Sequence, residues 1–241
     1  MKLFLLYTLI FFCSSAWSAE EQVEIHASLC PSSQEELLIQ LGREPVPTKS
    51  RDIWYLDYKN LSLNDSGKIL RIRKDHGKDK VSVTVKLRGQ IEQDFLKPDI
   101  DCEKDWYGFE VVSSCSLDSS LQSYEWDLAF EGQLPLTSLF STSQLHFLTN
   151  DGGQVNFKEL KIFGLIKAQI WKFDDKTLEV WSMESHGKHL EIYEISTRAS
   201  LKEAKEVERR LYQDLNSLGV RPCTNHISKT RTVLEFLSQE L

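Results

Sequence analysis

Four cationic side chains alternate with apolar ones in two neighbouring segments of the sequence, residues 68–74 and 81–89. They are Arg71 and Arg73 in the first segment and Lys86 and Arg88 in the second. Successive side chains of a strand point to opposite faces, so each segment has one cationic face and one apolar face. Guanidinium and ammonium groups gathered in this way suit contacts to phosphate oxygens. The alternative is a sheet face that is exposed to solvent, which has the same pattern.

Acidic residues also recur at a spacing of two, at Asp99, Asp101, Glu103 and Asp105. On a strand these four carboxylates share one face, where they repel one another unless cations or a metal ion lie opposite. We therefore predict that they either face the cationic strands or bind a divalent ion. A solvated edge on an exposed strand is an equally good interpretation.

The elements that position these residues follow from hydrophobic periodicity and turn residues. Segments 68–74 and 81–89 are predicted to form a hairpin, because a polar turn joins them. Further strands are predicted at 23–29, 52–58, 155–173, 178–183 and 189–199, and helices at about 33–42, at 201–218 and from Ser228 onward. Residues 115–153 contain no motif that we can interpret.

Three lysines in these later elements are candidates for anion contacts. Lys161 and Lys167 are expected on one face of the strand at 155–173, where Lys167 is the stronger candidate and Lys161 is better read as a surface residue. Lys229, near the start of the last helix, is a further candidate. The helix at 201–218 has an apolar stripe that predicts packing against the sheet and a charged face that is expected in solvent.

The first residues have the pattern of a secretory signal peptide. An apolar run from Leu3 to Phe12 is followed by small residues, and cleavage is expected after Ser18 or Ala19. The run is too short to span a bilayer. We therefore predict a signal peptide at residues 1–18, a single domain at 20–241 without a transmembrane segment, and a secreted or periplasmic location.

Charge excludes one class of partner. The chain has 29 basic and 36 acidic residues, and loss of Lys2 with the signal peptide changes the net charge from −7 to −8. This balance argues against a nucleic-acid-binding coat. The sequence also lacks the signatures of a P-loop, a Rossmann fold, a zincin and a hydrolase elbow.

Four cysteines remain after residues 1–18 are removed, which suggests two disulfides in an oxidising compartment. Three pairings are possible. We favour Cys102 with Cys115, which are close in sequence across an expected hairpin, and Cys30 with Cys223, which ties the two ends together. A structural zinc site is not favoured, because no two cysteines have the spacing of a Cys-x-x-Cys motif.

Five short motifs follow one another along the chain. They are a strand with Tyr-x-Asp, a short turn, an L-R-x-R strand, a strand ending in T-x-K, and an acidic strand before a long helix. The residues are Tyr55 to Asp57, Gly67, Leu70 to Arg73, Thr84 to Lys86, and Leu190 to Ser196. This series of motifs resembles the CYTH superfamily, or triphosphate tunnel proteins, which include a class of adenylate cyclase, thiamine triphosphatase and inorganic triphosphatases.

The resemblance implies an α+β fold, an antiparallel β-barrel of about eight strands with peripheral helices and a polar interior. On this reading Arg71, Arg73 and Lys86 point into the tunnel and Arg88 lies at its mouth, where they hold a polyphosphate. Acidic side chains of the family hold Mg²⁺ or Mn²⁺. The corresponding residues here are Glu24, His26 and Glu194.

The sequence departs from the family pattern at the acidic positions. The family has Glu-x-Glu-x-Lys in its first strand, whereas this chain has Glu24, His26 and Ser28. In the acidic strand Glu194 is retained, but Ser196 replaces the second Glu. His26 can still ligate a metal ion, although a single histidine is more often a hydrogen-bonded structural residue.

Three hypotheses follow. The leading one is an exported protein that binds a phosphorylated or polyanionic ligand in a basic tunnel, with catalysis weakened or lost. The second is a divalent-metal-dependent triphosphatase. The third is a non-catalytic envelope scaffold whose cations form internal salt bridges with Asp99, Asp101 or Glu103.

Overall fold

The computed structural model describes residues 21–44, 46–89, 99–106, 110–149, 152–223 and 228–239. The predicted signal peptide, residues 1–18, lies outside this part of the chain. Within it, no helix is both long enough and apolar enough to cross a membrane.

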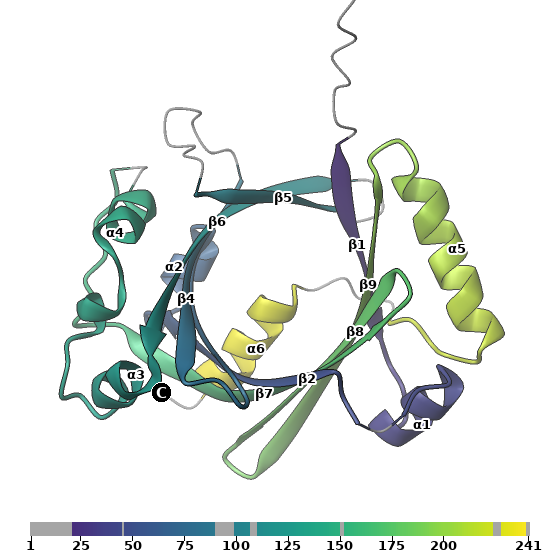
Figure 1. The fold of residues 1–241 in the computed structure, drawn as a ribbon, viewed down its shortest axis with the longest axis horizontal. Helices are drawn as coiled ribbons and strands as arrows, with labels where there is room; N and C mark the ends of the chain where they lie inside the picture. The colour runs from purple at the N-terminus through teal and green to yellow at the C-terminus, as the bar shows by residue number, and fades with distance from the viewer. Residues whose placement is uncertain are drawn as a thin grey trace, which may run out of the picture.

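Nine strands form a closed barrel in the order β1-β5-β6-β4-β3-β2-β7-β8-β9 (Figure 1). Their bounds are β1 Gln22–Leu29, β2 Lys49–Asp57, β3 Lys68–Asp75, β4 Lys80–Arg88, β5 Asp101–Trp106, β6 Val111–Gln122, β7 Lys161–Phe173, β8 Lys176–Ser185 and β9 Lys188–Ser200. Neighbouring strands are antiparallel except β1 and β5, which are parallel. The predicted α+β barrel is confirmed, with nine strands in place of about eight and one parallel pair.

Helices cover the outer face of the barrel on two sides (Figure 1). On one side α3 (Ser123–Phe130) and α4 (Thr142–Leu148) lie against β3, β4 and β6, and on the other α1 (Gln34–Gln40) and α5 (Ala204–Ser217) lie against β1, β8 and β9. Val81, Val83 and Val85 of β4 are fully buried beneath the first pair. Each such side chain contributes roughly 1.5–3 kcal/mol by leaving water.

This arrangement inverts the usual distribution of polarity in a small barrel. Most apolar residues of β1, β3 and β4 point outward, where the helices shield them, so the alternating polar residues of these strands point inward. Part of the interior is nevertheless apolar, because residues of β2, β7 and β8 form a cluster there with α6. A short helix, α2 (Ser62–Asp65), lies between β2 and β3, where the buried carboxylate of Asp57 accepts hydrogen bonds from the backbone of Leu63 and Asn64.

The last helix, α6 (Lys229–Ser238), lies within the outline of the ring in Figure 1. Its buried residues Val233, Leu234 and Leu237 pack in one apolar cluster with inward-facing side chains that include Ile53 and Tyr55 of β2. This helix therefore fills part of the barrel interior. The first residues of the helix border the polar part of that interior.

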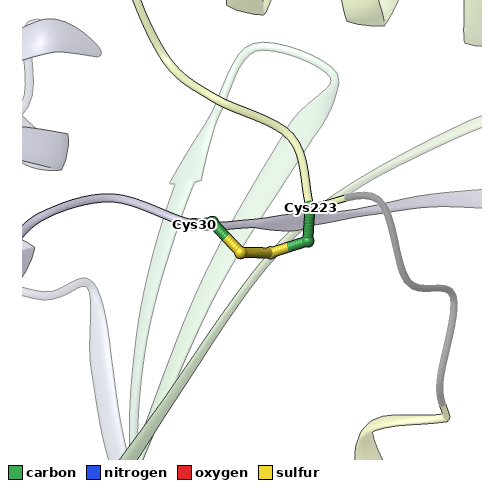
Figure 2. Close-up of a disulfide and its surroundings, with 2 residues drawn as sticks. All are labelled: Cys30 and Cys223. Atoms are coloured by element: carbon green, nitrogen blue, oxygen red, sulfur yellow. A yellow bond between two sulfur atoms is a disulfide. The ribbon is translucent and has the colours of Figure 1, made fainter.

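Two disulfides join the cysteines in the pairings that we predicted. Cys30 follows β1 and is bonded to Cys223, which precedes α6, with an S–S distance of 1.97 Å (Figure 2). Cys102 of β5 and Cys115 of β6 face each other in register and are also bonded.

The stretch at 115–153, in which no motif could be read, contains the second half of β6, a short 3-10 helix at Leu136–Leu139, and helices α3 and α4. Its leucines and aromatic residues form much of the apolar cluster that covers β4. Trp126 of α3 is 2% exposed and lies 5.1 Å from Trp54, measured between ring centroids. Residues 123–149 therefore cover the outer core, on the side of the barrel wall opposite the tunnel.

Candidate anion-binding tunnel

The barrel encloses a polar cavity of about 200 Å³. Its lining comes from strands around the ring and from the first residues of α6. The charges fall on two sides. The basic wall consists of five cations on the adjacent strands β2, β3 and β4, namely Arg51, Arg71, Arg73, Lys86 and Arg88. The acidic wall consists of five carboxylates on the adjacent strands β8, β9, β1 and β5, namely Glu24, Glu103, Asp105, Glu179 and Glu194.

Strand alternation produces the basic wall. Leu70 and Ile72 of β3 point outward and are fully buried in the outer core, so Arg71 and Arg73 must point inward. The same reasoning applies to β4, where the outward valines place Lys86 and Arg88 inside. Closure of the barrel brings the cationic faces of these strands to one cavity.

The guanidinium groups of the basic wall have few close carboxylate partners. Arg71 forms no ion pair with any described residue, and its buried Nε has no hydrogen-bond acceptor. Arg73 lies 3.6 Å from Asp118, measured from Nη2 to Oδ2. Arg88 donates a hydrogen bond of 3.1 Å to the hydroxyl of Ser228. Two cations of this wall are paired more closely. Arg51 Nε lies 3.3 Å from Asp75 Oδ1, and Lys86 forms an ion pair with Glu103.

Burial and a neighbouring cation both act on Arg73. Burial and the adjacent charge of Arg71 lower the pKa of Arg73 to about 10, although Asp118 opposes the shift. The guanidinium still carries its charge at neutral pH. The basic wall is therefore a site where an added anion relieves repulsion and satisfies donors at once.

The acidic wall has the opposite character, because two cations are built into it. Lys229 of α6 lies 2.6 Å from Glu179 and 2.7 Å from Glu194, measured from Nζ to the carboxylate oxygens. His26 of β1 lies 3.4 Å from Glu194 through Nδ1 and 3.2 Å from Asp105 through Nε2. The five side chains thus form one chain of alternating charge across the wall.

The pKa shifts in this wall follow from these contacts. Burial favours neutral His26, but the hydrogen bond to Asp105 and the close carboxylate of Glu194 outweigh burial and raise the pKa of His26 to about 10. Burial likewise opposes the charge of Lys229. The carboxylates of Glu179 and Glu194 outweigh this effect of burial and raise the pKa of Lys229. Burial raises the pKa of Glu194, but Lys229 and His26 lower it well below its usual range. All these groups are charged at neutral pH.

One group in the described residues has the ligand types and spacing of a metal site. Glu24, His26 and Asp105 each offer a donor atom, and these atoms lie within 4.8 Å of one another. However, both ring nitrogens of His26 face carboxylates, and an imidazolium has no lone pair for a metal ion. As they are arranged, these residues do not fit the Mg²⁺ or Mn²⁺ that the family resemblance implies.

Most residues singled out in the sequence lie in the tunnel. Arg71, Arg73, Lys86 and Arg88 line it together, as do Glu24, His26, Glu194 and Lys229. The acidic segment divides, because Glu103 and Asp105 line the cavity whereas Asp99 and Asp101 do not. Its predicted position opposite the cations is therefore right for two of the four carboxylates.

Lys167 is not part of the tunnel lining. The pairing of β2 with β7 shifts register between Ile53 and Tyr55, which inverts the alternation of β7. Lys167 consequently pairs with outward-facing Asp52, is exposed, and borders a separate surface pocket with Met183. Lys161 is also exposed and, as expected, is not part of the tunnel lining.

Two charged residues of the tunnel lining were not recognised from the sequence. Arg51 precedes the apolar run of β2, and Glu179 lies between Leu178 and Val180, which point outward. The alternation of apolar residues in β8 was a sufficient signal for an inward Glu179. No comparable signal marks Arg51, because its neighbours in sequence are polar.

No family model matches the chain, and no curated protein matches it. Two solved structures are similar in fold. A putative adenylyl cyclase from Hippeastrum, HpAC1, which is described as having a dominant triphosphatase activity, has a TM-score of 0.59 at 17% identity over 91% of this chain and 97% of its own. A putative adenylate cyclase from Bacillus halodurans has a TM-score of 0.55 at 18% identity over 88% of this chain and 97% of its own. The chain therefore has the tunnel-barrel fold of these proteins.

Proposed function

We propose that the protein is a divergent CYTH-like member that binds a small phosphorylated or polyanionic ligand at the basic wall, with catalysis weakened or lost. One observation carries the proposal. Arg71 has a buried Nε without an acceptor and no ion pair among the described residues, and its charge bears on Arg73. Leaving a guanidinium in this state is costly unless a ligand completes it.

The size of the cavity restricts the ligand. At about 200 Å³ it is smaller than the roughly 300–1,000 Å³ typical of pockets for drug-sized molecules. A short polyphosphate has the matching chemistry, because its oxygens accept the paired donors of arginine. The triphosphatase activity described for the Hippeastrum protein is consistent with this ligand class.

The test is calorimetric titration of the mature chain with tripolyphosphate, pyrophosphate, ATP and sulfated sugars. We expect binding of at least one phosphate compound and a loss of about 10–100-fold in Arg71→Gln, which corresponds to one charge-assisted contact of ~1.5–3 kcal/mol. Arg210→Gln is the matched control, because Arg210 is exposed on α5, outside the tunnel lining. No binding to any of these anions, or equal binding by Arg71→Gln, contradicts the proposal.

A metal-dependent triphosphatase is the second candidate, and the grouping of Glu24, His26 and Asp105 is the observation that favours it. It predicts phosphate release from tripolyphosphate with Mg²⁺ or Mn²⁺ and loss of that activity in Glu194→Gln. Inactivity with both metals across substrates rejects it. The scaffold hypothesis requires internal partners for the cations, and Lys86 with Glu103 satisfies this requirement whereas Arg71 does not.

Export belongs to the same proposal. Two disulfides fit a secreted or periplasmic protein, because thiols stay reduced in the cytosol of most cells. Mass spectrometry of the protein from its native source is expected to find a mature N-terminus at Ala19 or Glu20. An intact N-terminus at Met1 contradicts export by a cleaved signal peptide.

A further inference from the structure

The acidic wall is neutralised by cations that belong to the chain itself. Glu179, Lys229, Glu194, His26 and Asp105 follow one another in alternating charge, with each neighbouring pair of charged atoms 2.6–3.4 Å apart. The two central cations come from different ends of the sequence, His26 from β1 and Lys229 from α6. Together they supply two positive charges, which equals the charge of one divalent metal ion.

These contacts occupy the oxygens that a metal ion needs. A divalent ion such as Mg²⁺ or Mn²⁺ takes carboxylate oxygens directed at a common point. Here Glu194 is shared between Lys229 and His26, and Asp105 is directed at His26. A metal ion at this place displaces both cations from their partners, and each displaced cation then lies beside the incoming charge. Glu24 is the carboxylate of this wall that forms no ion pair with a described residue, and one carboxylate makes a weak site.

The surroundings of Lys229 show that its position is specific. Its ammonium group lies 4.4 Å from the centroid of the Trp181 ring, so it also makes a cation–π contact. Only 14% of its side chain is exposed. The apolar residues of the same helix are anchored inside the barrel. The ammonium is thus held by three groups and by the packing of α6.

We propose that His26 and Lys229 take the place of a divalent cation in the acidic wall, so that the tunnel binds its anion without a metal ion. This inference rests on the proposed function and specifies it. The basic wall contacts the ligand, and the acidic wall holds the barrel interior together electrostatically. His26 is a positioning residue in this scheme, because it directs Asp105 and Glu194 and contacts no ligand.

The experiment measures Mn²⁺ binding directly, in the absence of any anion, by the loss of the free-ion electron paramagnetic resonance signal. The full mature chain is expected to show no saturable Mn²⁺ binding. His26→Glu replaces the internal cation with a carboxylate, and we expect saturable Mn²⁺ binding to appear in this variant. Thr137→Glu is the control, because Thr137 is exposed in the 3-10 helix outside the tunnel lining and its replacement is expected to behave as wild type.

A second measurement separates this inference from the proposed function. Tripolyphosphate is titrated into the wild-type chain in the presence of EDTA, and the affinity is expected to be unchanged within about twofold from that measured without EDTA. Saturable Mn²⁺ binding by the wild type that Glu194→Gln removes overturns the inference, as does anion binding that disappears with EDTA. In the latter case the proposed function survives. If no anion binds under any condition, the proposed function is wrong. The measurement of Mn²⁺ binding by the wild-type chain remains valid even if a variant does not fold.

Discussion

The two walls of the tunnel carry equal numbers of opposing formal charges but are completed in different ways. In the acidic wall Lys229 and His26 lie between carboxylates, so that most charges have a partner from the chain. In the basic wall Arg71 has none among the described residues, and Arg73 has a carboxylate only at 3.6 Å. A charge that is paired with another residue of the chain stabilises the fold. A partly buried charge without such a partner indicates a ligand.

Packing on the outer face of β3 and β4 explains why the fold tolerates the unpaired arginine charge on their inner face. Desolvating a charge without a partner is unfavourable by several kcal/mol. The apolar outer surface of the same strands offsets this cost, since β3 and β4 bury their Leu, Ile and Val side chains beneath α3 and α4. The binding side of the tunnel is therefore stabilised from the other face of its own strands.

The largest effect is expected from breaking the acidic wall. Lys229→Met keeps much of the side-chain volume but removes the cation that Glu179 and Glu194 share, so that Glu179 loses its ion pair and Glu194 keeps only His26. We expect the free energy of unfolding, measured in urea, to fall by about 3–5 kcal/mol. Adding Glu179→Gln to this variant should recover part of the loss. A loss below about 1 kcal/mol, the value of an exposed ion pair, shows that Lys229 does not hold the wall.

A smaller effect is expected from pH through His26. Because its pKa is raised to about 10 in the folded chain, its contribution to stability is complete below the unfolded value of about 6.5 and is lost as the pH rises toward about 10. Between about pH 6.5 and 9.5 the wild type should lose on the order of 2 kcal/mol more than His26→Gln does in urea unfolding. Parallel pH profiles for the two proteins contradict the ion pairs of His26.

The smallest effect on stability is expected in the basic wall. Arg71→Gln removes a cation that has no partner among the described residues and relieves its repulsion of Arg73. The free energy of unfolding without ligand should therefore stay within about 0.5 kcal/mol of the wild type or rise. A loss as large as that of Lys229→Met shows that Arg71 is a structural residue, and the two walls then do not differ.

Sequence reasoning was sufficient for the basic wall because strand alternation is a local property. The period of two in 68–74 and 81–89 decides which side chains share a face, and barrel closure then brings Arg71, Arg73, Lys86 and Arg88 together. Lys167 was a candidate for an anion contact, but it lies outside the tunnel lining, because the register shift opposite Ile53 and Tyr55 has no local signal in the sequence. A one-residue irregularity inverts every later position in a strand.

The acidic wall was less predictable because its pairings are long-range. Glu194 and Lys229 are distant from His26 in the sequence, and only the closed barrel and α6 bring them together. The types of residue showed that the metal-binding pattern was depleted, but not that His26 and Lys229 neutralise what remains. Helices α3 and α4 were missed for a related reason, since their apolar residues follow the surface of the barrel rather than a strong helical period.

The bond between Cys30 and Cys223 spans 193 positions of the sequence and encloses the whole of the chain from α1 to α5 (Figure 2). A protease that cuts a single loop anywhere in that span yields two polypeptides that remain covalently joined. The nicked protein then migrates as one species on a non-reducing gel and separates only when the disulfide is reduced. The cross-link therefore keeps the two pieces of a cut chain joined where β1 meets the segment before α6.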